Sequence, residues 1–208
     1  MAYAFGRATL TTLTYHRVQE DSAPGETADP ELISCAPAEF GAQLDYLSRH
    51  FTVVSLDEVV SHLDGRRRLP ARSLLITFDD GYRDNHDLAA PELQARSLPA
   101  VFFVTTGFIG TSDPMWWDFC RYAVLGTRAR SAELPLLGRR SLATRAERES
   151  TYVEVRELLT LVGDHERRAA LRELCERLDV EPATRGPAFM DVAELRSLVR
   201  RGFAVQAH

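Results

Sequence analysis

LLITFDDGY, residues 74–82, carries a run of apolar and β-branched residues directly into two aspartates, Asp79 and Asp80. A continuous apolar run of this kind is typical of a parallel strand that is buried on both faces of a sheet. Two adjacent carboxylates at the end of such a strand repel each other and lose hydration, so their charge must be offset. A bound metal ion is the partner that this pattern indicates.

The composition of the 208-residue chain is that of a globular protein with one sizeable core. Apolar residues make up 45% and charged residues 26%, which are ordinary values. The net charge of −5 argues against a nucleic-acid partner, because phosphate binding requires a basic surface. Cys35, Cys120 and Cys175 are widely spaced, so we expect buried or free thiols rather than a disulfide framework.

The sequence shows neither a secretion signal nor a membrane span. Residues 1–18 lack the apolar core of a signal peptide. No stretch approaches the roughly 18 uninterrupted apolar residues that a membrane-spanning helix needs. We therefore expect a cytoplasmic protein.

Strand and helix patterns alternate along most of the chain. Five segments are predicted to be strands because apolar, β-branched or aromatic residues dominate them: 8–15, 51–56, 73–78, 99–107 and 203–207. Helices are predicted between them from apolar residues at helical spacing, at 36–50, 55–65, 87–97 and 190–202. Ser55 and Asp191 are the expected caps of two of these helices. This alternation indicates βαβ units and a parallel sheet or barrel.

The segment 121–185 differs from the rest of the chain. Apolar residues recur at 3.6-residue spacing amid many Arg and Glu residues over 145–164 and 165–180. Such patterns are typical of amphipathic helices. We interpret 121–185 as a helical insertion into the α/β scaffold.

The paired carboxylates stand where parallel α/β proteins place their reacting groups, at the carboxyl end of a strand. Gly81 lets the backbone turn sharply there, so both side chains can approach one site. One carboxylate can hold a metal ion while the other takes a proton from water whose pKa the metal lowers. The pattern therefore predicts divided roles for Asp79 and Asp80.

TFDDGY at 77–82 resembles the first motif of the polysaccharide deacetylase (NodB-homology) family, carbohydrate esterases that remove acetyl groups from amino sugars. Further segments resemble that family in the same order: LTYHRV at 13–18, LPAVFFVTTGFIG at 98–110 with MWWD at 115–118, and FMDVAELRSLVRRGFAVQAH at 189–208. The resemblance implies one domain across 1–208, a distorted (β/α) barrel that is incomplete at its carboxyl-terminal end and carries a helical insertion.

The resemblance also implies site roles and an activity. Asp79 would be the general base, and Asp80 and His208 would be ligands of Zn²⁺ or another divalent transition metal. The family's second histidine follows four residues after the first, and this chain ends at His208. The implied reaction is hydrolysis of N-acetyl groups on a polysaccharide or related glycan. We expect a chain that stops at His208 to be a weak enzyme by itself.

Three other residues are candidates for substrate contact. His16 follows a predicted strand end, which suits a structural histidine as well as one that lines the pocket. Trp116 and Trp117 can stack on sugar faces, although aromatic residues after a strand also serve simply as packing.

Alternatives stay open at each level. An Asp-Gly pair is common in solvated turns, and a histidine at a chain end can belong to a frayed terminus. The protein can also be a non-catalytic carbohydrate-binding or interaction module that keeps the fold. An open barrel edge at 203–207 would favour self-association.

Overall fold

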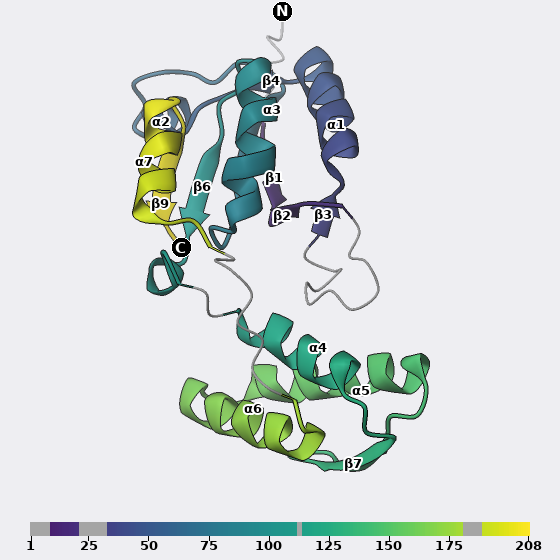
Figure 1. Ribbon diagram of the computed structural model, residues 1–208. Helices are drawn as coiled ribbons and strands as arrows, with labels where there is room; N and C mark the ends of the chain where they lie inside the picture. Colours follow the sequence, from purple (N-terminus) through teal and green to yellow (C-terminus); the bar gives the residue numbers. More distant parts are fainter. Residues whose placement is uncertain (1–8, 21–32, 112–113, 181–188) are drawn as a thin grey trace, which may run out of the picture. The chain divides into compact units, whose positions relative to one another are not determined.

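The computed structural model describes residues 9–20, 33–111, 114–180 and 189–208. These residues form two compact units, and each unit has a hydrophobic core of its own. The first unit contains the described residues within 9–111 together with 189–208, and the second contains 114–180. Figure 1 follows the chain through both units by colour.

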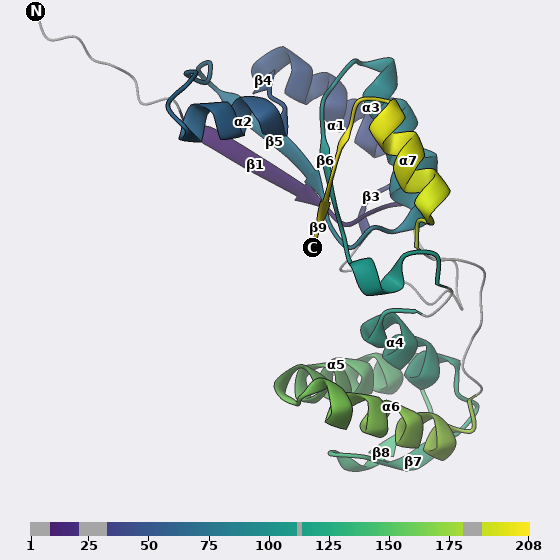
Figure 2. The same ribbon diagram turned by 90° about the vertical axis from the view of Figure 1, so that its left-hand side faces the viewer.

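A parallel sheet of five strands forms the centre of the first unit (Figure 2). Its strands are β1 (Leu10–Tyr15), β4 (Thr52–Val53), β5 (Ser73–Phe78), β6 (Val101–Val104) and β9 (Ala204–Ala207). β1 pairs along the whole of one edge of β5, β4 and β6 share its other edge, and β9 pairs with β6. The predicted α/β class with a parallel sheet is therefore confirmed. The sheet order is β1-β5-β6-β9, with β4 paired to β5 off this path, in agreement with an incomplete barrel.

Among the described residues, this unit has four α-helices: α1 (Pro37–His50), α2 (Leu56–Leu63), α3 (Ala90–Ala95) and α7 (Val192–Arg200). The side chains of Ser55 and Asp191 accept backbone hydrogen bonds at the starts of α2 and α7, as predicted. A π-helical turn, η1 (Asn85–Ala89), precedes α3, and a 3₁₀ turn, η2 (Thr106–Phe108), follows β6.

Helices on both faces of the sheet explain the uninterrupted apolar sequence of β5. All six of its residues are buried. Successive side chains of a strand point to opposite faces; accordingly, Leu74, Ile76 and Phe78 pack with α1, α3 and α7, whereas Leu75 packs with α2. Each fully buried apolar side chain of this size stabilises the fold by roughly 1.5–3 kcal/mol, so β5 is a main anchor of the unit.

Two short strands were not predicted from the sequence. β2 (Arg17–Val18) and β3 (Ile33–Cys35) pair with each other in parallel. They have only two and three residues, too few for an alternating pattern to be recognised. β2 is important for the site because it begins directly after His16.

The second unit is mainly helical. It comprises α4 (Trp116–Gly126), β7 (Ser131–Leu134), β8 (Gly138–Ser141), α5 (Arg145–Leu161) and α6 (Asp164–Leu178). The two predicted amphipathic helices correspond to α5 and α6, and their buried residues join those of α4 in one core. The antiparallel hairpin of β7 and β8 was not predicted, because β8 carries Arg and Ser rather than alternating apolar residues.

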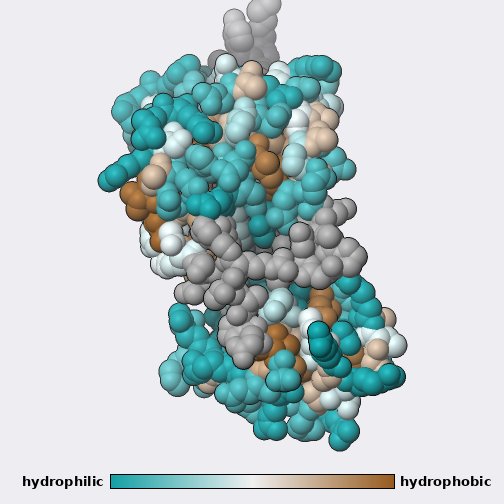
Figure 3. All heavy atoms as spheres, viewed as in Figure 1, coloured by the Kyte–Doolittle hydropathy of each residue, from teal (hydrophilic) through white to brown (hydrophobic). Residues whose placement is uncertain are grey.

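The surface of both units is mostly hydrophilic on the face shown in Figure 3, with hydrophobic residues in small separate groups. Cys35, Cys120 and Cys175 are buried and free, as expected. In the part of the chain that the structure describes, no helix combines the length and the apolar character needed to cross a membrane.

The turn after β5 has an unusual backbone. Asp80 and Gly81 both have positive φ, at 72° and 84°. Aspartate is among the few residues other than glycine that adopt this region readily. A Cβ on Gly81 would lie 3.0 Å from Val104 Cγ1 and 3.3 Å from Val104 Cα. Gly81 is therefore required both for its conformation and for the close approach of β6.

Replacing Gly81 tests this double requirement. Gly81→Ala should destabilise the protein by about 2–4 kcal/mol, because left-handed strain adds to overpacking against Val104. Gly65→Ala is the matched control: Gly65 also has positive φ, at 72°, yet a Cβ there would meet nothing within 4 Å. It should cost only about 1–2 kcal/mol. The measurement is urea unfolding of both variants; equal losses would show that contact with Val104 is unimportant.

Candidate metal centre and active site

Three backbone hydrogen bonds tie together the carboxyl ends of four strands. The N–H of Asp79 donates to the carbonyl of Tyr15 at 2.9 Å, which joins the ends of β1 and β5. Thr105 N–H donates to Asp80 O at 3.2 Å, and His208 N–H donates to Val104 O at 2.9 Å. These bonds continue the strand registers beyond the sheet. They fix the backbones that carry both carboxylates and His208.

Of the residues that the sequence analysis placed at this edge of the sheet, Asp80 is a deeply buried one. Its side chain is only 9% exposed, whereas that of His208 is 47% exposed. His208 Nε2 lies 3.6 Å from Asp80 Oδ1. This pair brings together the two residues predicted to be metal ligands, and His208 directly follows β9 with its N–H bonded to Val104 O.

The electrostatics of Asp80 show which other residues surround it. Its carboxyl pKa is raised, first because burial disfavours the charged form and also because Asp79 is close by. His16 and His208 act in the opposite direction and favour the carboxylate. The interacting groups at this end of the sheet are therefore four residues that the sequence analysis had named: Asp79, Asp80, His16 and His208.

A second segment crosses the turn and helps to hold it. Met190 N–H donates to Gly81 O at 3.0 Å, and Tyr82 forms an antiparallel bridge with Phe189. The rings of Tyr82 and Phe189 stack with centroids 4.9 Å apart. This segment leads into α7, so the helix before β9 is connected directly to the turn of the paired carboxylates.

The sequence analysis did not identify two charged residues next to this turn, Arg17 and Asp84. Arg17 Nε and Asp84 Oδ2 form an ion pair at 2.8 Å. The available signal was their position, because Arg17 follows His16 directly and Asp84 lies three residues after Gly81. Residues so close in sequence to candidate site residues can control how those residues are held.

Trp116 and Trp117 lie at the start of α4, in the second unit. Trp116 packs partly in the core of that unit, and the guanidinium of Arg167 lies 4.9 Å from its ring centroid. Both features describe packing within the unit. The contact of these tryptophans with sugar stays a prediction.

Possible metal ligands also occur at a second place. Among the described residues, His86, Asp87 and Glu194 form the one group of three ligand atoms lying within 4.8 Å of one another. Glu194 is already engaged there, since Arg83 Nε lies 2.8 Å from its Oε1 and Asp191 N–H donates to its Oε2. The charge of Glu194 is thereby balanced by the protein. Among the described residues, the groups that favour the charged form of Asp80 are His16 and His208.

Comparison with known proteins shows what part of the chain is similar to. Residues 66–153 match the family model "Polysaccharide deacetylase". The match contains Asp79, Asp80 and both tryptophans, and it ends within the segment expected to be an insertion.

Two curated relatives match about half of the chain. The poly-beta-1,6-N-acetyl-D-glucosamine N-deacetylase of Escherichia coli K12 is 27% identical over 103 residues, which cover 49% of this chain and 15% of that protein. The enzyme of the same name from Staphylococcus epidermidis is 28% identical over 109 residues, covering 49% of this chain and 37% of the relative. The chain thus matches well under two thirds of the length of either relative.

Solved structures of deacetylases also resemble the chain. A de-N-acetylase from Aggregatibacter actinomycetemcomitans aligns with a TM-score of 0.49 at 16% identity, covering 96% of this chain and 54% of the other. IcaB from Ammonifex degensii aligns with a TM-score of 0.44 at 27% identity, covering 93% and 81%.

The family match over 66–153 includes the TFDDGY motif on which the resemblance was based, and the curated relatives carry the same family function in their names. Residues 66–153 therefore carry a match to the polysaccharide deacetylase family, the family that the sequence motifs resemble.

Proposed function

We propose that this protein is a metal-dependent hydrolase that removes N-acetyl groups from a polysaccharide of N-acetylglucosamine. One observation carries the proposal: the buried carboxylate of Asp80 lies beside His208 and His16, next to a second carboxylate, at the carboxyl end of a parallel sheet. The curated relatives support the substrate class, because their names specify poly-beta-1,6-N-acetyl-D-glucosamine.

The donor set around Asp80 fits a divalent transition metal such as Zn²⁺. Imidazole nitrogen and carboxylate oxygen are ordinary zinc ligands, and catalytic zinc sites commonly combine them while leaving a position open. The carboxyl pKa of Asp80 is raised by burial, so its charged form is costly without a cation. Asp80 and His208 would hold the metal, and His16 is the nearest further donor among the described residues that interact with Asp80.

The chain's own residues can then perform hydrolysis in divided roles. When bound, the ion would polarise the acetyl carbonyl and lower the pKa of a nearby water molecule. Asp79, which is partly exposed and adjacent to Asp80, takes the proton from the attacking water. The water oxygen adds to the carbonyl carbon, the C–N bond breaks as the proton held by Asp79 passes to the departing nitrogen, and acetate and a free amine are the products. His16, which interacts with Asp80, would orient the substrate.

Asp79 and Asp80 should differ sharply when each is replaced in the full-length protein. Asp80→Ala should lose bound zinc, because it removes the buried ligand. Asp79→Asn should keep zinc but lower kcat by about 10²–10⁴-fold, since it removes the base and leaves the ligands. Zinc content by isothermal titration, together with acetate release from an N-acetylglucosamine oligosaccharide, checks both results. Equal loss of zinc in the two variants would contradict the division of roles.

We also propose that the second unit, which contains the insertion expected at 121–185, carries no catalytic group. The apolar clusters of the first unit and of the second unit contain no residue in common. Replacing the second unit's 113–186 by a short Gly/Ser linker should therefore leave a folded sheet.

In that shortened protein, acetate release from a short N-acetylglucosamine oligosaccharide should stay within about tenfold of the original, because the reacting carboxylates are retained. Trp116→Phe/Trp117→Phe in the intact protein is the control, as it removes the indole groups without removing the unit. A shortened protein that melts cooperatively yet releases no acetate would contradict the proposal.

A further inference from the structure

Arg17 and Asp84 form a largely buried ion pair beside the proposed site. The side chains are 15% and 9% exposed, and the Nε–Oδ2 distance is 2.8 Å. The residues are separated by 67 positions in the chain. The pair therefore joins the segment that follows β1 to the segment that follows the paired carboxylates.

The carboxylate of Asp84 binds a backbone group as well as the guanidinium of Arg17. Its Oδ1 also accepts a hydrogen bond from the backbone N–H of Val18, at 3.4 Å. The guanidinium carbon of Arg17 lies 4.4 Å from the centroid of the Tyr82 ring, which is itself fully buried. Such stacking suits the planar guanidinium better than an ammonium group. Asp84 and Tyr82 thus fix both the side chain and the backbone of β2.

These contacts constrain His16 from both sides. Tyr15, which precedes it, accepts the hydrogen bond from Asp79 N–H at 2.9 Å. Arg17, which follows it, is held by Asp84. His16 is thereby fixed between two anchored neighbours, and both anchors come from the segment that carries the paired carboxylates.

We propose that Arg17 and Asp84 are positioning residues, a clamp that holds His16 against the carboxylates of the active site. The catalytic consequence of this inference rests on the proposed function. The structural part, that Arg17 and Asp84 hold His16 in place, does not depend on activity. A buried ion pair is weak evidence for stability, because apolar residues of similar volume often serve equally well. The ion pair of Arg17 and Asp84 nevertheless has a specific geometry. A specific geometry is needed to orient the imidazole of the neighbouring His16.

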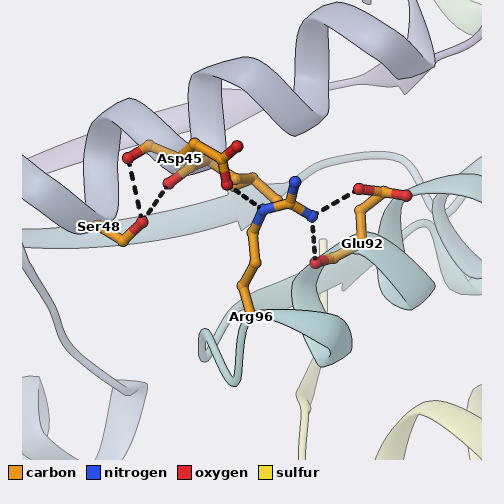
Figure 4. A network of polar contacts seen from close by, with 5 residues as sticks. Asp45, Ser48, Glu92 and Arg96 are labelled. Atoms are coloured by element: carbon orange, nitrogen blue, oxygen red, sulfur yellow. Dashed lines mark hydrogen bonds and ion pairs between the residues drawn. The ribbon is translucent and has the colours of Figure 1, made fainter.

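A second ion pair in the same unit provides a matched control. Arg96 on the end of α3 contacts Asp45 of α1 at 2.7 Å and Glu92 at 2.6 Å, in a network that Figure 4 shows. The side chains of Asp45 and Arg96 are 50% and 24% exposed. This pair also joins two segments distant in sequence, but neither residue adjoins the end of a strand of the sheet.

Amide hydrogen exchange measures the clamp without any need for turnover. In Asp84→Asn, exchange at Val18 should accelerate about tenfold or more, whereas the amides in the middle of β5 stay protected. Arg17→Lys keeps a positive charge beside Asp84 and should show the same local change in a protein that folds. Asp45→Asn should leave Val18 unchanged. Unaltered exchange at Val18 in both clamp variants, or a general loss of protection in both, would overturn the proposal.

Kinetics in the full-length, zinc-loaded protein then test the link to His16. Asp84→Asn should lower kcat about 10–100-fold with little change in KM, because displacement of a positioned group by about 1 Å has an effect of that order. In a His16→Ala background the same change should cost less than about threefold, since the residue that the clamp positions is gone. Equal losses in both backgrounds would overturn the positioning role. A wild-type protein that releases no acetate would instead refute the proposed function, and the exchange result would still decide whether the clamp holds β2.

Discussion

The parallel pairing of β5 up to its last residue is the constraint on which the site depends. Phe78 lies in register with Tyr15 on one side and with Phe102 on the other. The next residues continue this order through backbone hydrogen bonds that lead to Asp79 and Asp80. A one-residue slip would exchange the two faces of the strand and move Leu74, Ile76 and Phe78 from their cluster to the side of the sheet that packs with α2. The same packing that stabilises the core therefore sets where the carboxylates point.

Two buried aspartates on one turn show two ways of stabilising a charge. Burial raises the carboxyl pKa of both Asp80 and Asp84. Asp84 is compensated within the protein, by Arg17 at 2.8 Å and by the N–H of Val18. Asp80 interacts with the imidazoles of His16 and His208, and Nε2 of His208 lies 3.6 Å from its Oδ1. Protein groups thus balance the charge of Asp84, whereas the surroundings of Asp80 suit the proposed metal ion.

Sequence patterns predicted the features whose cause is local. The apolar run of β5 and the caps at Ser55 and Asp191 were recognisable because periodicity and capping depend on neighbouring residues. The meeting of Asp80 with His208 could be predicted because both follow parallel strands, and parallel strands end at the same edge of a sheet. The pairing of Arg17 with Asp84 could not, since either residue has many partners in an unfolded chain and only the folded turn selects one. The positive φ of Asp80 was likewise hidden, because Gly81 alone signalled the turn.

The position of β9 has a consequence for the order in which the molecule is assembled. β9 pairs with β6 through Val101 and Ala204, residues separated by 204 − 101 = 103 positions. Closing so long a loop is entropically costly and slow, whereas contacts within 114–180 are local and form early. When the second unit folds first, fewer residues between β6 and β9 remain to be ordered as these two strands pair. His208, at the end of β9, is then the last of the proposed ligands to reach its place, so the metal would stabilise the completed sheet and not its precursors.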